Sequence, residues 1–193
     1  DRSLLDGHRG PCTLLAAQRA SLVASAVEVL AERPDVRFAL LGGKGMASGF
    51  QAAFNRIPHC LDLFLGETAS LPFPAFKGDK LTWDEFVEQA RVRELDYGLE
   101  ITLIGKYRED TMNVVERFKA EVLDRRVPAE RADIRLSTIH QAKGREWDLV
   151  QACDDLSPLA LFAPNENDDP DCPCARYQWK ELGDHYNFWY VAL

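Results

Sequence analysis

The stretch LSTIHQAKGREWDLV, from Leu136 to Val150, combines two apolar ends with a polar middle. Its first residues, with Leu136 and Ile139, read as a buried strand, and Leu149 begins another. Between these ends lie a histidine, a lysine, a glycine and a glutamate, which is more polarity than a turn between two core strands needs. Because open α/β sheets bind ligands in loops at the ends of their strands, we expect a site here.

The polar residues of this loop suit a nucleotide or a nucleic acid. Strand alternation predicts that Thr138 and His140 lie on one face, where His140 can stack on a base or donate to a phosphate. Lys143 and Gly144 suit a close approach of backbone to phosphate, and Glu146 can accept hydrogen bonds from ribose hydroxyls. The alternative is a plain polar connection between two strands, with Lys143 and Glu146 merely solvated.

The residues from His140 to Trp147, HQAKGREW, closely resemble motif V of the UvrD-like superfamily 1 DNA helicases. The common form of that motif is T-x-H-x-A-K-G-L-E-F, and Arg145 and Trp147 replace its leucine and its phenylalanine. The segment NFWYVAL, from Asn187 to Leu193, resembles the start of motif VI, which continues in that family through Y-V-A-L-T-R-A. The resemblance predicts Thr-Arg directly after Leu193 and a Gly-Lys-Ser/Thr loop further upstream.

The resemblance implies the second, C-terminal RecA-like domain of such a helicase. Its fold is α/β, a parallel sheet of the P-loop NTPase type flanked by helices, with a small helical insertion. In this interpretation residues 1–50 form the first part of the domain, which includes the motif IV region. Residues 51–130 form the helical insertion, a reduced 2B-like unit, and residues 131–193 complete the domain with motif V and the start of motif VI. Within this family, the pair Asp154 and Asp155 most resembles the F-box DNA helicase branch.

By the same resemblance, the whole protein is an ATP-dependent helicase that moves 3′ to 5′ along single-stranded DNA and unwinds duplex DNA in repair or recombination. Its partners would be single-stranded and duplex DNA, and ATP with Mg²⁺, held mainly by the first RecA-like domain of the same chain. Glu146 and Gly144 would face ATP. The residues that would face single-stranded DNA are Thr138, His140 and Lys143.

One departure from the family concerns the arginine that ends the first strand and reaches the ATP phosphates. Alignment places Ala17 there, and Arg19 can take the role only if the turn is rearranged. The arginine of motif VI is expected beyond Leu193, so we expect no catalytic residue within this chain. The missing arginine leaves open a second interpretation, a non-catalytic helicase-derived module that holds DNA or a partner.

Composition limits the class of protein. The 193 residues are 46% hydrophobic and 28% charged, which is typical of a globular domain. A net charge of −8 argues against DNA binding through bulk positive charge, so any contact with DNA must be local. The sequence shows no signal-peptide character and no apolar run near the roughly 20 residues that span a bilayer. Its five irregularly spaced cysteines favour a reducing, intracellular location, the nucleus in a eukaryote or the cytoplasm in a bacterium.

Periodicity and turn residues predict the elements around the loop. Strands over 11–17 and 36–41 flank a helix with Ser21 as its N-cap, which makes a βαβ unit with parallel strands. Thr82 and Glu85 form a capping box that opens a further helix. The other predicted elements are helices over 50–65 (interrupted at Pro58), 99–107, 111–125 and 181–193, a strand over 148–153, and loops over 66–80 and 158–179.

Two further patterns resemble ligand sites. The segment GGKGMAS, residues 42–48, looks like a phosphate loop, but Lys44 is followed by glycine where such a loop needs Ser or Thr. We therefore expect Gly42 and Gly43 to form a strand-terminating turn. A small zinc enzyme is the other alternative, although a Cys-x-Cys pair lacks the usual spacing of structural zinc ligands and we expect no metal site. Its ligands would be Cys172, Cys174 and His185.

Overall fold

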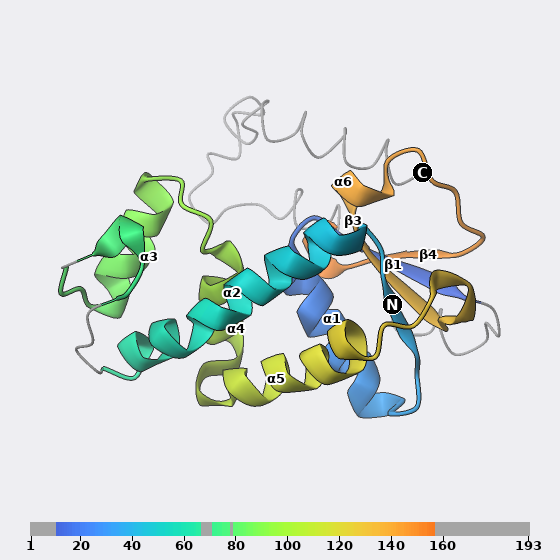
Figure 1. The fold of residues 1–193 in the computed structure, drawn as a ribbon, viewed down its shortest axis with the longest axis horizontal. Helices are drawn as coiled ribbons and strands as arrows, with labels where there is room; N and C mark the ends of the chain where they lie inside the picture. Colours follow the sequence, from blue (N-terminus) through green and yellow to red (C-terminus); the bar gives the residue numbers. More distant parts are fainter. Residues whose placement is uncertain (1–10, 67–70, 78, 157–193) are drawn as a thin grey trace, which may run out of the picture.

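The computed structural model describes residues 11–66, 71–77 and 79–156. In these residues a parallel sheet lies at one end of a layer of helices (Figure 1). The loop predicted over 158–179 and the helix predicted over 181–193 lie outside the described residues.

Within the described residues the sheet has four strands in the order β2-β3-β1-β4, and every neighbouring pair is parallel. Its strands are β1 (Cys12–Ala16), β2 (Phe38–Leu40), β3 (Ile134–Thr138) and β4 (Val150–Ala152). The predicted α/β class with a parallel sheet and flanking helices is confirmed. The first two strands run parallel as predicted, and β3 lies between them.

On one face of the sheet pack α1 (Arg19–Glu32) and α2 (Gly43–Phe64), and α4 (Gly98–Tyr107) and α5 (Thr111–Phe118) pack in turn against these two helices. A π-helical turn over Lys119–Asp124 continues α5 and contacts β2. Alternate strand residues such as Leu14 and Leu136 share one apolar core with these helices. At its centre the rings of Phe50 and Phe54 contact Phe118, with centroids 5.1 and 5.9 Å from it. Burial of this side therefore fixes the helical layer against the sheet.

Two predicted helix boundaries are wrong. The helix α2 starts at Gly43 and runs through Pro58 without a break. Phe54, Ile57 and Leu61 are buried on both sides of the proline, and this burial outweighs the backbone hydrogen bond that Pro58 lacks. The N-cap of α1 is Gln18, one turn earlier than the predicted Ser21.

A second core lies away from the sheet, around α3 (Trp83–Val92) (Figure 1). Phe76, Phe86 and Tyr97 form its centre, with ring centroids 5.2 to 5.5 Å apart. The predicted capping box is confirmed, because the Thr82 amide donates to Glu85 and the Glu85 amide donates to the Thr82 hydroxyl. Residues 51–130 thus contribute to both cores, and the domain boundaries stay a prediction.

The opposite face of the sheet carries the short helix α6 (Ile139–Ala142). Leu15 of β1 packs there against Ile139 and Ala142, and Trp147 adds partly buried surface. The chain therefore leaves β1 toward one face of the sheet and β3 toward the other.

A clasp between Arg37 and Asp133 joins the chain just before β2 to the chain just before β3. The Arg37 amide and Nε donate to Oδ2 of Asp133 at 2.9 and 3.0 Å, and Nη2 donates to Oδ1 at 2.8 Å. The Asp133 amide donates back to the Arg37 carbonyl oxygen at 2.9 Å. These bonds to Arg37 lower the pKa of Asp133 from its ordinary value of 3.8 to about 2.

We expect that the free energy of unfolding of Asp133→Asn falls less steeply than that of the wild type as the pH is lowered below about 4. The pKa of Asp133 is lower in the folded chain, so the stabilisation is complete above pH 3.8 and is lost as the pH falls toward about 2. The side chains of Arg37 and Asp133 are 48% and 37% exposed, and solvent screening limits the contribution at neutral pH to about 0.5–1 kcal/mol. Urea unfolding at a series of pH values measures the effect. The control, Asp35→Asn, removes a carboxylate outside the clasp, and a fall for Asp133→Asn as steep as that of the control would contradict the prediction.

Candidate functional site

The ends of β1 and β3 meet at one edge of the sheet. Their last residues, Ala16 and Thr138, are direct partners in the parallel register. From this point the chain enters α1 on one face and α6 on the other. Neighbouring strands whose connections leave toward opposite faces form a topological switch point, where open α/β sheets bind their ligands.

A cavity of about 460 Å³ opens at this point, and we call it the switch-point cavity. Three residues predicted from the sequence lie together in it, although Arg19 was expected to contact ATP and Thr138 and His140 to contact DNA. The full lining is Ala17, Gln18, Arg19, Ala20, Met46, Asp96, Gly98, Leu99, Thr138 and His140.

The predicted alternation of Thr138 and His140 along a strand is wrong. The strand β3 ends at Thr138, and Ile139 begins α6, so the period changes between the two residues. Thr138 is buried at the N-cap of α6, whereas His140 is exposed on that helix. A single helical turn thus brings both side chains to the same cavity.

Arg19 is the first residue of α1, and a carboxylate from a distant loop binds it. Its Nη2 lies 2.9 and 3.0 Å from the two carboxylate oxygens of Asp96. Its other terminal nitrogen lies over Gly49 of α2, where a Cβ atom would be only 2.6 Å from Nη1. The guanidinium of Arg19 therefore packs against the backbone of α2 at Gly49, and its ion pair with Asp96 lies at the wall of the cavity.

Lys143 and Gly144 form the turn that ends α6. Gly144 has a φ of +76°, a conformation that favours glycine, and the Arg145 amide donates to the Ala142 carbonyl oxygen at 3.0 Å. Lys143 is exposed. Neither Lys143 nor Gly144 lines the switch-point cavity, so they lie beside it on the surface.

Glu146 lines a different cavity, of about 640 Å³. This second cavity is lined by Leu41, Ala129, Glu130, Arg135, Arg145, Glu146, Trp147 and Asp148. Nε of Arg135 donates to the Ala129 carbonyl oxygen at 3.1 Å, which holds this guanidinium at the wall. The polar loop therefore presents His140 to one cavity and Glu146 to another, and the predicted ATP residues Arg19 and Glu146 do not share one.

Two residues of these cavities were missed in the sequence. Arg135 is a charged residue in the apolar strand IRLST, and that irregularity was a usable signal. Asp96 gave no signal, because only the tertiary fold brings it to Arg19 from 77 residues away.

The glycine pair forms the predicted strand-terminating turn and also begins α2. Gly42 has a φ of +103°, and a Cβ on it would lie 3.0 Å from Cβ of Met46 and 3.1 Å from the Gln141 side chain. The turn is therefore packed directly against α6. This close approach explains the glycine without any bound phosphate.

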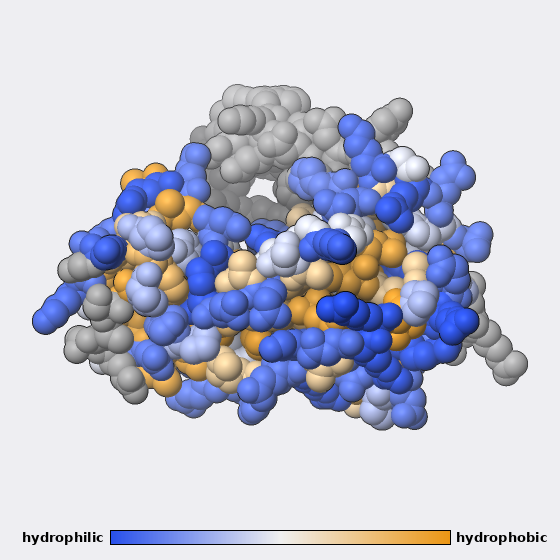
Figure 2. Space-filling view, in the orientation of Figure 1, coloured by the Kyte–Doolittle hydropathy of each residue, from blue (hydrophilic) through white to orange (hydrophobic). Residues whose placement is uncertain are grey.

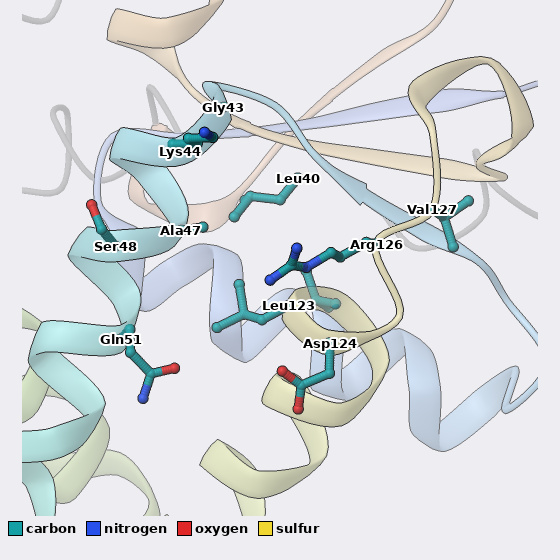
Figure 3. Close-up of a pocket in the computed structure, with 11 residues that line it drawn as sticks. Leu40, Gly43, Lys44, Ala47, Ser48, Gln51, Leu123, Asp124, Arg126 and Val127 are labelled. Carbon is teal, nitrogen blue, oxygen red and sulfur yellow. The ribbon is translucent and has the colours of Figure 1, made fainter.

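A third cavity, of about 560 Å³, lies between the start of α2 and the π-helical end of α5 (Figure 3). Arg126 and Gln51 point into it from opposite sides, and Leu40 and Leu123 line it between them. The space-filling view shows apolar residues in the middle of this face, between α2 and α5 (Figure 2). None of the predicted site residues lines this cavity, so the switch-point cavity is the better candidate site.

Within the described residues, no three or more His, Cys, Asp or Glu side chains gather as they would to hold a metal ion. The proposed zinc ligands Cys172, Cys174 and His185 lie outside these residues, as does the segment that resembles motif VI. Over the same part of the chain, every helix is too short or too polar to cross a membrane.

We expect Gly42→Ala to destabilise the fold by about 1–3 kcal/mol, because a left-handed backbone and a close contact with Met46 combine at this position. Gly45→Ala is the matched control. Its Cβ would meet nothing within 4 Å in α2, so it should be neutral or stabilise by up to about 1 kcal/mol. Urea unfolding followed by circular dichroism compares the two. Equal midpoints for both variants would show that the Gly42 turn carries no such constraint.

Comparison of the chain with protein-family models, with curated proteins and with solved structures gave no match.

Proposed function

We propose that this chain is the second RecA-like domain of a UvrD-like, ATP-dependent DNA helicase that moves 3′ to 5′ along single-stranded DNA. The observation that carries the proposal is the position of the loop that resembles motif V. It follows β3 at the switch point of a parallel sheet, and it lines one cavity with His140 and another with Glu146. Switch points and cavities are where α/β proteins bind their ligands, so a loop with a residue in each of two cavities is suited to contact a nucleotide and a strand of DNA.

Each side of the loop has chemistry that suits its proposed ligand. His140 and Lys143 are exposed and close in sequence at α6, where an imidazole and an ammonium can contact a base and a phosphate. Glu146 is exposed in a cavity that is also lined by Arg135 and Arg145, together with the carboxylates of Glu130 and Asp148. A carboxylate for ribose hydroxyls beside two guanidinium groups for phosphates fits ATP.

The proposed mechanism couples these two sides. ATP bound between this domain and the first RecA-like domain favours a closed arrangement, and its hydrolysis releases that arrangement. Mg²⁺ would neutralise the phosphates and would be held mainly by acids of the first domain. The loop that contains both His140 and Glu146 would move each time the two RecA-like domains close or open, and this movement would shift the bound DNA strand.

A specific observation favours a second candidate, a non-catalytic module that holds DNA or a partner. The position of the phosphate-binding arginine of the family is occupied by Ala17, and nearby Arg19 is paired with Asp96. In this candidate the domain keeps its cavities and its strand-binding loop while ATP hydrolysis is lost.

We expect Lys143→Ala to weaken the binding of a fluorescein-labelled oligo-dT to this chain. Loss of one phosphate contact should also reduce the slope of log K against log salt by about 0.7. His140→Ala should cost about 1–3 kcal/mol if a base stacks on the imidazole. Fluorescence anisotropy over a salt series measures both effects. Lys77→Ala is the control, since it removes the same charge from an exposed position near α3, and equal losses for both lysine variants would contradict a local site.

For the protein that includes the first RecA-like domain, we expect DNA-stimulated ATP hydrolysis. Glu146→Gln should lower its kcat/KM for ATP about tenfold, because charge-assisted hydrogen bonds to ribose are lost. Steady-state assays with and without oligo-dT measure this. A wild-type protein that binds oligo-dT without DNA-stimulated hydrolysis would instead establish the non-catalytic module.

A further inference from the structure

The Arg19 and Asp96 pair occupies the wall of the switch-point cavity. Arg19 is 26% exposed and Asp96 is 75% exposed, so the carboxylate reaches the guanidinium from the solvent side. The contact crosses from the start of α1 to the loop before α4. A cation that lines a cavity at the carboxyl ends of parallel strands is well placed for an anionic ligand, and here the protein's own carboxylate binds it.

A hydrogen bond from Arg56 holds the main chain of Asp96 in place. Its carbonyl oxygen accepts a hydrogen bond from Nη2 of Arg56 at 2.8 Å. Nε of Arg56 is paired with Glu100, whose side chain is only 1% exposed in the core between α2 and α4. The main chain of Asp96 is thus anchored to a partly buried ion pair, while its own carboxylate stays in contact with solvent.

The carboxylate of Asp96 binds Arg19 only weakly. Exposed ion pairs contribute about 0–1 kcal/mol, because solvent screens the charges and the side chains lose freedom. A terminal phosphate of a nucleotide carries more negative charge than a carboxylate, and any phosphate can offer a guanidinium two parallel hydrogen bonds, whereas both oxygens of Asp96 contact the same nitrogen, Nη2 of Arg19. A phosphate that enters the cavity can therefore displace the side chain of Asp96 without disturbing the anchored main chain.

A second carboxylate lies at the same end of α1. The backbone amide of Gln18, the N-cap, donates to Oδ2 of Asp155 at 2.8 Å. Asp155 itself does not line the switch-point cavity, whose ionisable groups are Arg19, Asp96 and His140. Asp155 satisfies a backbone group, whereas Asp96 binds the guanidinium, so Asp96 is the carboxylate whose removal frees a cation for a ligand.

We propose that Asp96 is the resident counter-ion of a phosphate-binding site formed by Arg19, and that a phosphate group of the ligand displaces it. This inference deepens the proposed function and rests on it for the source of the phosphate. Asp96 then sets how tightly the cavity binds anions, because every ligand has to compete with it. The phosphate can belong to a DNA strand or to a nucleotide, and separate probes distinguish the two.

The test compares Asp96→Asn with the wild-type chain at constant ionic strength. The probes are fluorescein-labelled oligo-dT, read by anisotropy, and ATP and inorganic tripolyphosphate, read by calorimetry. Asp96→Asn keeps the shape of the side chain and removes its charge, and we expect about three- to tenfold tighter binding of at least one probe. Tighter binding of oligo-dT alone assigns the phosphate to DNA, and tighter binding of ATP and tripolyphosphate assigns it to a nucleotide.

Two controls separate this effect from net charge and from folding. Asp35→Asn removes the same charge beyond the other end of α1, about 20 Å away for a 14-residue helix, which exceeds the Debye length of about 8 Å. Arg19→Lys keeps the charge and should bind more weakly than wild type, because it lacks the planar guanidinium. Arg19→Ala combined with Asp96→Asn should abolish the gain, and unchanged thermal unfolding shows that the variants fold.

Equal affinities for Asp96→Asn and Asp35→Asn would overturn the inference, and so would a gain that survives the loss of Arg19 or no binding of any probe. Tripolyphosphate binding that depends on Arg19 and Asp96, without oligo-dT or ATP binding, would support the counter-ion and contradict the proposed function. Oligo-dT binding that is weakened by Lys143→Ala and unchanged by Asp96→Asn would support the proposed function and contradict the role of Asp96 as a counter-ion.

Discussion

The parallel pairing of β1 with β3 is the constraint on which the rest of the structure depends. It runs from Cys12 opposite Ile134 to Ala16 opposite Thr138, and it joins segments that lie far apart in the chain. Both strands are buried almost throughout, so the register is fixed by packing on two faces. Because the pairing ends with Thr138, the turn into α1 and the loop into α6 come together at one edge, and the switch-point cavity forms between them.

The two faces of this pair serve different purposes. On the α1 face, Leu14 and Leu136 belong to the large core that holds α1, α2, α4 and α5. On the other face, the described residues that pack with Leu15 include Ile139 and Ala142 of the short α6, and a polar loop follows directly. The large core supplies rigidity behind the site, and the polar loop after β3 places His140 and Glu146 at the walls of two cavities. Rigid strands with a polar loop at their ends are a common basis for ligand binding.

Charge in this molecule is arranged as local pairs. The chain has a net charge of −8, and several of its cations bind carboxylates from other elements, such as Arg37 with Asp133 and Arg56 with Glu100. Burial of Glu100 raises the pKa of its carboxyl group, and Arg56 opposes this effect. Such pairs join distant segments, and at the switch point the same kind of pair neutralises Arg19. An acidic chain can therefore contact a phosphate only where a cation becomes available locally, which gives Lys143 and Arg19 their importance in the proposed function.

The sequence by itself determined the local features. Alternation and apolar runs located the four strands of the described residues, Thr82 and Glu85 predicted the capping box, and the polar loop after β3 identified a candidate site. These features depend on residues that are neighbours along the chain, so their pattern is visible without a fold. Only the tertiary structure decided that β3 lies between β1 and β2, that α2 continues through Pro58, and that the polar loop divides between two cavities. Periodicity in the sequence predicts which face of a helix or strand is buried, but it does not determine which other element covers that face. The contact of Asp96 with Arg19 exists only because separate elements pack together.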